Sequence, residues 1–303
     1  MPNRSVITYF LLVGFSEIQE GQNLHFVVFF ITYLVALMGN LLIITIIVLN
    51  HHLHTPMYFF VLNLSIVDLG YISVTIPKAM ANSLMKTRWI LYSHCVVQTF
   101  SFVLFGASEF FLLTVMAYDR YVAICHPLHY ETVMKRGACI QMAGFAWTFG
   151  LLTATLHTAA TFASPFCSNV INQFFCEIPQ LLKLTCSNMY LLEVGALILT
   201  GCLYFSCFLF ILMSYMHIFK AVMRIPSVQG RQKAFSTCLP HIIVLSMFYF
   251  FGVFAYLRPI NRTPSRMDLL AAVAYCVVPP FMNPLIYSMR NKDIKAALWK
   301  LID

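Results

Sequence analysis

Seven long apolar stretches constrain this chain most, because each is long enough to cross a lipid bilayer as a helix. A spanning helix needs about 20 mostly apolar residues. Stretches of this kind cover residues 24–49, 57–80, 92–125, 140–163, 190–223, 233–257 and 267–289. Of the 303 residues, 60% are hydrophobic and 10% are charged, a balance typical of a chain whose solvent is lipid. We expect an all-α membrane protein, a single seven-transmembrane helix bundle over residues 1–303.

The connections between the spans indicate the orientation in the membrane. With residues 1–23 outside and the tail 290–303 in the cytoplasm, eleven of the nineteen Lys and Arg residues lie on the cytoplasmic side and eight elsewhere. This bias has the sign of the positive-inside rule. The same orientation places two glycosylation sequons outside, at Asn3, the favoured acceptor, and at Asn261 in a short loop. We expect a multi-pass plasma-membrane protein with an extracellular N-terminus.

We interpret the formal charge of +8 as basic residues at the cytoplasmic edge of the bundle, where they face anionic lipid and an acidic partner. No motif indicates nucleic-acid binding.

Four cysteines lie on the expected outer side. Cys95 begins the third span, and Cys167, Cys176 and Cys186 lie in the one extended connection, near residues 164–189. Four cysteines in an oxidising compartment allow three pairings, and spacing alone does not choose among them. The other six cysteines lie in the spans or near the cytoplasm, where we expect them to pack as small apolar side chains.

The segment from Met116 to Tyr130 reads MAYDRYVAICHPLHY and brings Arg120 to the point where the third span leaves the membrane. An ionised Arg near hydrocarbon needs a partner, and Asp119 is the nearest. Three further segments accompany it, HTPMYFFVLNLS at 54–65, KAFSTCLPH at 233–241 and PFMNPLIYSMRNK at 280–292. Together, in this order, they resemble the signatures of rhodopsin-like G-protein-coupled receptors. The longer form of the first resembles the tetrapod-type (class II) odorant-receptor branch of that family.

The resemblance implies roles for residues that spacing alone does not assign. It implies that activation involves Asp119, Arg120, Tyr121, Tyr215, Asn283, Pro284 and Tyr287. It also implies that the inner end of the sixth helix, from Lys233, swings outward to admit a G-protein helix. Pro284 lies inside the seventh span and frees a carbonyl, which we expect Asn283 or water to satisfy.

The resemblance also bears on the cysteines and on the tail. It favours the bridges Cys95–Cys176 and Cys167–Cys186, with Cys95–Cys186 as the main alternative. In the tail, apolar side chains at spacings of four and three residues, from Ile294, predict a short amphipathic eighth helix on the inner membrane surface. The family's usual eighth helix agrees with this interpretation.

Two acids lie at membrane depth, Asp68 in the second span and Glu109 in the third. Since no Lys or Arg pairs with them at that depth, each must face the bundle interior. They can share a proton, accept hydrogen bonds from Asn40 and Asn283, or hold a cation. The resemblance implies a sodium site that favours the inactive state. An intramembrane protease fits poorly, because neither acid lies in a motif that would activate water, so we expect no enzyme.

The ligand pocket is expected in the outer third of the bundle, under the cysteine-rich loop. Its predicted lining is Phe102, Val103, Gly106, Ala107, Leu199, Thr200, Leu203, Tyr249, Val253, Tyr256, Val273 and Cys276. Such apolar walls with a few hydroxyls suit a small, mostly hydrophobic ligand. Tyr249 lies where the family usually has a tryptophan switch, so we expect it to couple the pocket to helix movement.

Together with this apolar lining, the resemblance implies an odorant receptor that binds a small volatile ligand and activates a stimulatory G protein, which raises cyclic AMP. No cofactor is expected other than the sodium ion. A receptor for a non-odorant metabolite is the alternative within the family. A membrane transporter is the alternative from another class, although the chain lacks the internal repeat that such proteins usually carry.

Overall fold

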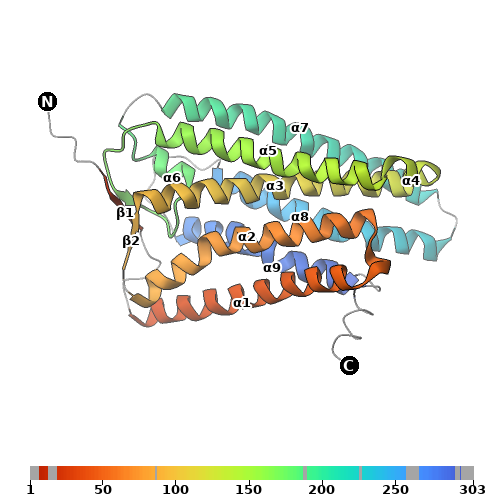
Figure 1. Cartoon of the computed structure of the whole chain (residues 1–303), viewed down its shortest axis with the longest axis horizontal. Coiled ribbons are helices and arrows are strands. Elements are labelled where there is room, and N and C mark those ends of the chain that lie inside the picture. Colours follow the sequence, from red (N-terminus) through yellow and green to blue (C-terminus); the bar gives the residue numbers. More distant parts are fainter. Residues whose placement is uncertain are drawn as a thin grey trace.

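The computed structural model describes residues 7–12, 19–85, 87–186, 190–224, 227–256, 266–290 and 294. Seven long helices occupy most of these residues, in agreement with the expected seven-helix bundle. They are α1 (Gln19–Leu49), α2 (Pro56–Met85), α3 (Tyr92–Cys125), α5 (Arg136–Phe162), α7 (Tyr190–Met223), α8 (Val228–Tyr256) and α9 (Arg266–Arg290). Figure 1 shows them side by side along one axis, with β1 (Tyr9–Leu12) and β2 (Trp89–Leu91) at one end of the bundle and α4 (Tyr130–Val133) at the other.

The composition of these helices suits a lipid environment. By length and composition, α1, α2, α3, α5 and α7 can each cross a membrane, and α9 contains a shorter apolar segment, Leu270–Pro284. Many large apolar side chains remain exposed on them, such as Phe145 on α5 and Ile198 on α7. Since hydrocarbon offers no hydrogen bonds, a helix that satisfies its own backbone is the suitable element. The protein is therefore a multi-pass membrane protein.

Several helices extend beyond the apolar runs that predict them. The first begins at Gln19 rather than near residue 24, and the second continues to Met85 rather than ending near residue 80. Polar residues at these ends continue the backbone hydrogen bonding of the helix past the hydrocarbon, so apolarity alone underestimates the length. The predicted eighth helix lies outside the described residues except for Ile294, which is buried.

Short elements connect the long helices. At the inner end these are η1 (His51–Leu53), η2 (Pro127–His129) and α4 (Tyr130–Val133), and α6 (Ile178–Leu182) lies near the outer end. The outer end also carries three short strands, β1 (Tyr9–Leu12), β2 (Trp89–Leu91) and β3 (Val170–Ile171).

The three strands form one sheet with β1 in the centre, an addition to the all-α expectation. Phe10 pairs with Ile90 in the antiparallel half, and Leu12 pairs with Ile171 in the parallel half. All four of these side chains are buried, in a cluster that includes Cys95. The sheet therefore holds the N-terminal segment against the loop between α2 and α3 and the loop between α5 and α7.

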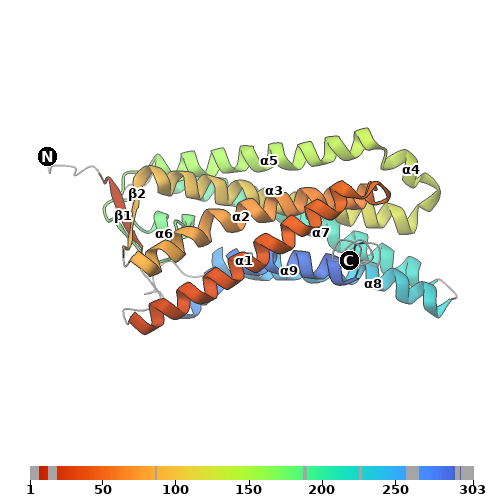
Figure 2. The same cartoon turned by 60° about the horizontal axis from the view of Figure 1, so that its bottom comes forward.

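The core is arranged around α3, which packs against α2, α5, α7 and α8. Gly150 of α5 lets two backbones approach closely, since a Cβ there would lie 2.8 Å from the carbonyl oxygen of Leu104 and would collide with Ser108. Figure 2 shows α1 crossing the bundle obliquely over α9. The long axis of α3 thus provides a common depth scale for the sites described next.

Candidate ligand pocket and signalling elements

Two disulfides shape the outer loop between α5 and α7. The bonds join Cys95 to Cys176 and Cys167 to Cys186, with Cα separations of 5.6 and 5.5 Å. These are the pairs that the family resemblance favours, and the alternative Cys95–Cys186 bridge is not formed. The six remaining cysteines are free. The first bridge ties the loop to the start of α3 and the second closes the loop on itself.

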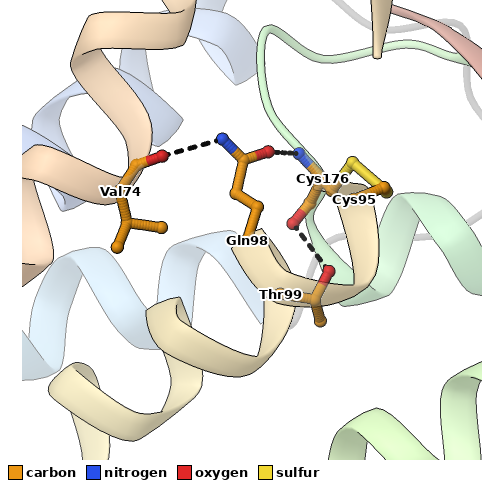
Figure 3. Close-up of a disulfide and its surroundings, with 5 residues drawn as sticks. All are labelled: Val74, Cys95, Gln98, Thr99 and Cys176. Carbon is orange, nitrogen blue, oxygen red and sulfur yellow. Dashed lines mark hydrogen bonds between the residues drawn. A yellow bond between two sulfur atoms is a disulfide. The ribbon is translucent and has the colours of Figure 1, made fainter. Parts of the chain in front are cut away.

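Gln98 fixes the loop to two helices at once, as Figure 3 shows. Its side-chain oxygen accepts a hydrogen bond from the backbone N–H of Cys176 at 2.9 Å, and its amide donates to the carbonyl of Val74 at 2.9 Å. Pro77 interrupts the same turn of α2, because it has no N–H to donate to the carbonyl of Ser73. The Thr99 hydroxyl adds a longer bond, 3.4 Å, to the carbonyl of Cys176. Sequence reasoning missed Gln98, although an amide residue in an apolar span, one turn after Cys95, is a usable signal.

An aromatic cluster lies beneath the loop. Phe175 from the loop contacts Phe102 of α3 with ring centroids 5.1 Å apart, and Phe102 stacks on Tyr71 of α2 at 4.8 Å. Tyr275 of α9 contacts Phe102 at 5.8 Å, and Phe174 contacts Phe175 at 4.8 Å. The loop therefore inserts two rings among α2, α3 and α9, and closes the outer end of the bundle with apolar surface. Of these five rings, the sequence prediction included only Phe102.

The predicted pocket residues divide by their place in the fold. Those that are buried or partly buried are Phe102, Val103, Gly106, Ala107, Thr200, Tyr249, Val273 and Cys276. Tyr249 stacks on Phe208 of α7, with ring centroids 4.1 Å apart. The side chains of Val253 and Tyr256 lie outside the described residues.

Leu199 and Leu203 do not line the interior, which corrects their assignment to the pocket. They are 67% and 37% exposed, on the side of α7 that faces away from the bundle. The buried face of this helix instead carries Glu193, Ala196 and Thr200. Successive residues of a helix differ by about 100° in direction, so Thr200 faces inward and Leu199 outward. Because α7 is apolar nearly all round, its sequence gives no sign of this rotation.

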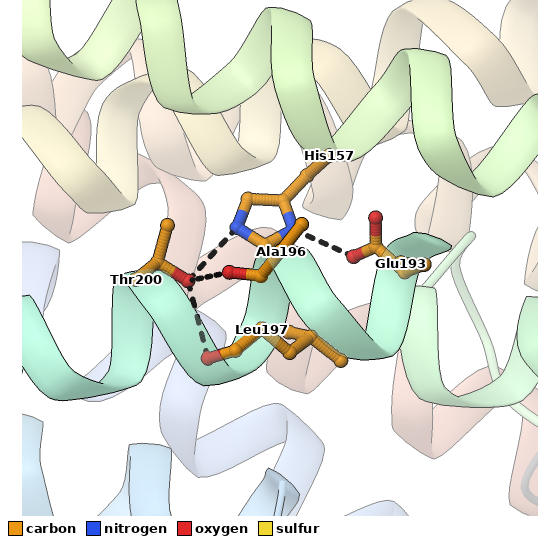
Figure 4. A network of polar contacts seen from close by, with 5 residues as sticks. All are labelled: His157, Glu193, Ala196, Leu197 and Thr200. Carbon is orange, nitrogen blue, oxygen red and sulfur yellow. Dashed lines mark hydrogen bonds and ion pairs between the residues drawn. The ribbon is translucent and has the colours of Figure 1, made fainter. Parts of the chain in front are cut away.

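A buried polar group joins α5 to α7 at the same outer end (Figure 4). His157 Nδ1 lies 2.6 Å from Glu193 Oε1, and His157 Nε2 lies 3.1 Å from Thr200 Oγ1. The Thr200 hydroxyl is also 2.9 Å from the Ala196 carbonyl, to which it can donate. The prediction included Thr200 but neither His157 nor Glu193. An acid and a histidine within apolar spans were the available signal.

The two acids at mid-depth converge on one amide. Asn283 Nδ2 donates to both carboxylate oxygens of Asp68, at 3.1 and 3.0 Å, and to Glu109 Oε1 at 3.3 Å. Both acids are fully buried. Within the described part of the chain, Glu109 Oε2 and Asn283 Oδ1 have no hydrogen-bond partner. The structure therefore brings together three residues from three helices, with two oxygens still able to bind.

Asn40 has a different partner from the one expected. Its amide donates to the Pro280 carbonyl at 2.9 Å and to the Ala36 carbonyl at 3.0 Å, and not to Asp68 or Glu109. The Pro280 carbonyl is the one that Pro284 leaves free, four residues later. The expectation that Asn283 or water satisfies it is corrected, because α1 supplies the donor.

The inner end of α3 carries a three-residue ionic contact. Arg120 Nη2 lies 2.9 Å from Asp119 Oδ2, and the Tyr130 hydroxyl donates to Asp119 Oδ1 at 2.8 Å. Asp119 is 1% exposed. Burial, followed by the nearby Asp119 carboxylate, raises the pKa of the Tyr130 hydroxyl, so it remains a donor. Both carboxylate oxygens thus have a donor.

The other predicted activation residues lie nearby. The Tyr121 hydroxyl is 3.1 Å from His126 Nε2. Tyr215 of α7 packs against a buried cluster that includes Ile218 and Cys238, and so reaches α8. The side chain of Tyr287 lies outside the described residues.

Comparison with known proteins gives a consistent result. A family model described as "Olfactory receptor" matches residues 29–303. The human protein "Olfactory receptor 14A16" is 48% identical over 303 residues, which is 100% of this chain and 98% of that protein. "Olfactory receptor 14I1", also human, is 50% identical over 302 residues, 99% of this chain and 97% of that protein.

Among solved structures, the crystal structure of squid rhodopsin superposes with a TM-score of 0.70 at 16% identity, covering 93% of this chain and 85% of that one. At this identity the likeness concerns the fold, a seven-helix bundle.

Proposed function

The chain belongs to the olfactory receptor family, and from this premise we propose that it binds a small, mostly hydrophobic volatile ligand and activates a stimulatory G protein, which raises cyclic AMP. The match of the family model to residues 29–303 carries the proposal. Ligand binding favours a conformation that is less populated without it, and thereby couples the outer end of the bundle to the inner end.

The ligand site lies at the outer end, under the disulfide-bonded loop. Phe102 and Cys276 are buried there, and Gly106 lies so near Tyr71 that an added Cβ would be 3.3 Å from its ring. Aromatic and small apolar side chains supply affinity by burial, and the ligand must share space with Phe175. Val103, Ala107, Thr200, Tyr249 and Val273 complete the described lining, and Val253 and Tyr256 belong to the same proposal.

The inner end transmits the signal through Arg120. In the structure its guanidinium pairs with Asp119 while Tyr130 holds the second carboxylate oxygen. Release of this contact frees Arg120 for a G-protein segment, and rearrangement of Tyr121, Tyr215 and Tyr287 accompanies it. Pro284 and its neighbour Asn283 supply the hinge in α9, and the inner part of α8 moves outward.

A sodium ion fits the mid-depth acids. Buried oxygens of Glu109 and Asn283 lack partners among the described residues, and carboxylate and amide oxygens are the ligands that hard cations prefer. Asp68 and Glu109 would hold the ion, which would offset their like charges and favour the arrangement seen here. Among the described residues no three His, Cys, Asp or Glu side chains lie together, so a transition-metal site has no support.

The orientation follows the distribution of charge. We place the receptor in the plasma membrane with its N-terminus outside, where the oxidising compartment supports the two disulfides. The proposed glycan acceptors Asn3 and Asn261 lie outside the described residues. The basic inner rim faces anionic lipid and the G protein.

The test is a cyclic AMP reporter assay in cells that display the receptor, with a chemically broad panel of volatile compounds. Arg120→Ala at matched surface level is the control. A dose-dependent rise that the variant loses supports the proposal. A rise that persists in Arg120→Ala contradicts signalling through Arg120, and a response confined to non-volatile metabolites assigns the chain to the other receptor class.

A further inference from the structure

A polar seam runs between α5 and α7, defined by Thr153, His157, Glu193, Thr200 and Tyr204. Thr153 and Tyr204 share a side-chain hydrogen bond, and the imidazole of His157 bridges Glu193 and Thr200. Apart from Thr200, the proposed function assigns no role to these residues. Ionisable side chains within spans are costly, and they therefore point to function.

Holding α5 against α7 explains only part of the seam. Both ring nitrogens of His157 have partners, and Glu193 Oε1 is one of them. Glu193 is 0% exposed, and its Oε2 has no hydrogen-bond partner among the residues that the structure describes. A buried carboxylate oxygen without a donor costs free energy, and an isosteric side chain with one acceptor would serve the helix contact equally well. The second oxygen is therefore available to a ligand.

The seam lies at the depth of the pocket. Gly150 of α5 is level with Ser108 of α3, where the two helices touch. Because the helices run in opposite directions, His157, seven residues further along α5, is level with residues seven positions earlier on α3, next to Phe102 and Val103. These distances along the two helices are equal, about two turns.

The face of α3 that meets α7 connects the seam to the pocket. Phe110 of α3 contacts Tyr204 with ring centroids 4.9 Å apart. Ala107 and Val103 precede Phe110 by three and seven residues, so they lie on the same face. Both belong to the proposed lining. A ligand against this wall therefore lies beside the seam.

A second hydrogen-bonding group accompanies Glu193 at the outer end. Thr161 lies one turn outward from His157 on the same face of α5, and is 0% exposed. Its hydroxyl, and that of Ser164 three residues later, are buried without partners within the described residues. A threonine hydroxyl both donates and accepts, whereas an ionised carboxylate only accepts.

We propose that Glu193 Oε2 and the Thr161 hydroxyl form a polar subsite for a ligand that carries a hydroxyl group, an alcohol or a phenol. The ligand O–H donates to Glu193 Oε2, and its oxygen accepts from Thr161. The inference rests on the proposed function and narrows its ligand class. An ether of the same skeleton lacks the donor and leaves the carboxylate oxygen unsatisfied.

The experiment compares medium-chain and aromatic alcohols with their methyl ethers in the cyclic AMP assay. In the wild-type receptor, each active alcohol should have an EC50 about 10- to 100-fold lower than its ether, as expected for a hydrogen bond to a charged group. Glu193→Gln replaces the free oxygen by an N–H₂ donor when its own oxygen faces His157. This variant should lose the preference for alcohols, so that the EC50 of each ether is equal to or lower than that of its alcohol.

Two further variants separate ligand contact from packing. Thr161→Val keeps the side-chain shape, removes the hydroxyl, and should reduce the alcohol preference. Thr153→Val breaks the inner bond of the seam and should leave the ratio of the two EC50 values unchanged. Equal potency of alcohols and ethers on the wild type, or an unchanged ratio in surface-displayed Glu193→Gln, overturns the subsite and leaves the receptor function intact.

A second measurement keeps the two proposals distinguishable. Thermal unfolding of the purified wild-type chain is followed with an alcohol or with its methyl ether. If no compound raises cyclic AMP, greater stabilisation by the alcohol supports the subsite while signalling fails. Equal stabilisation by both compounds overturns the subsite whatever the signalling result.

Discussion

Tyr130 of the short helix α4 donates its hydroxyl hydrogen to Asp119 Oδ1 across 2.8 Å, and so holds the carboxylate that pairs with Arg120. The two residues are eleven positions apart and on different helices. The aromatic Tyr130, the acidic Asp119 and the basic Arg120 therefore act as one unit at the inner end of α3.

We expect Tyr130→Phe to raise basal signalling. The change removes one hydrogen bond to a charged group, and this weakens the hold on Arg120 and increases basal cyclic AMP by about 2- to 10-fold at equal surface level. Glu131→Gln, an exposed neighbour in α4, is the matched control and should leave the basal level unchanged. Basal activity in Tyr130→Phe equal to that of the wild type would show that the bond does not restrain the receptor.

Replacing Gln98 should destabilise the receptor. Gln98→Leu removes the bonds to Val74 and to Cys176, and we expect the free energy of unfolding to fall by about 2 to 3 kcal/mol. Gln98→Glu retains the acceptor for the Cys176 N–H, and its free energy of unfolding should lie between those of the wild type and Gln98→Leu. Thermal unfolding of purified protein measures both, and an order in which Gln98→Leu is the more stable variant would contradict the clamp.

Stability should depend on pH through Glu177, which precedes α6 in the outer loop. Burial raises the pKa of its carboxyl to about 7, against the ordinary 4.5, and the Gln173 amide and Lys183 oppose this. Between these values the folded chain keeps a proton that the unfolded chain releases. The contribution of Glu177 to the free energy of unfolding is therefore fully present below about pH 4.5. It is lost as the pH rises towards 7, by about 3 kcal/mol in total.

Glu177→Gln should remove this dependence. Its free energy of unfolding, minus that of the wild type, should increase between about pH 5 and about pH 8. Taking the difference cancels the titration of other groups. A difference that stays constant over this range would exclude a protonated Glu177.

The two disulfides should differ in their contribution. The Cys95–Cys176 bridge closes a separation of 81 residues and the Cys167–Cys186 bridge one of 19. The chain-entropy model gives about 4.5 and about 3 kcal/mol for loops of these lengths. Paired Cys→Ser variants, compared by thermal unfolding, should follow this order. The reverse order would mean that contacts within the smaller loop outweigh loop entropy.

Sodium should lower agonist potency, provided that the ion is held at mid-depth. Exchanging sodium for choline at constant ionic strength should decrease the EC50 of an active ligand in the wild type. In Glu109→Gln, which removes one charge next to Asn283, the EC50 should be the same in both salts. A sodium effect that survives in Glu109→Gln would locate the ion elsewhere.

The sequence predicted the elements that depend on apolar length, but not those that depend on rotation or on distant pairing. Seven apolar runs define seven helices because hydrocarbon thickness sets a minimum length. The direction of each side chain is a different matter. In α7 nearly every face is apolar, so the sequence did not show that Thr200 is buried and Leu199 exposed. The buried face became visible only through the polar contacts of Thr200 and Glu193.

Long-range partners were the second limit. That Asn40 of α1 donates to the Pro280 carbonyl depends on how α1 lies against α9, which no local pattern encodes. The rings of Phe174 and Phe175 reach the pocket because the Cys95–Cys176 bridge and Gln98 hold the loop down. The acids Asp68 and Glu109 were located correctly because an unpaired charge in a span must face inward.

The sheet at the outer end also sets an order of events during synthesis. The strand Tyr9–Leu12 leaves the ribosome first, yet its parallel partner, Val170–Ile171, follows about 160 residues later. At about 5–20 residues per second, translation of that interval takes roughly 8 to 30 s. Until then the first strand has no complete sheet to join, so its protection from protease marks the moment when the first four spans have been made and the outer loop has been delivered across the membrane.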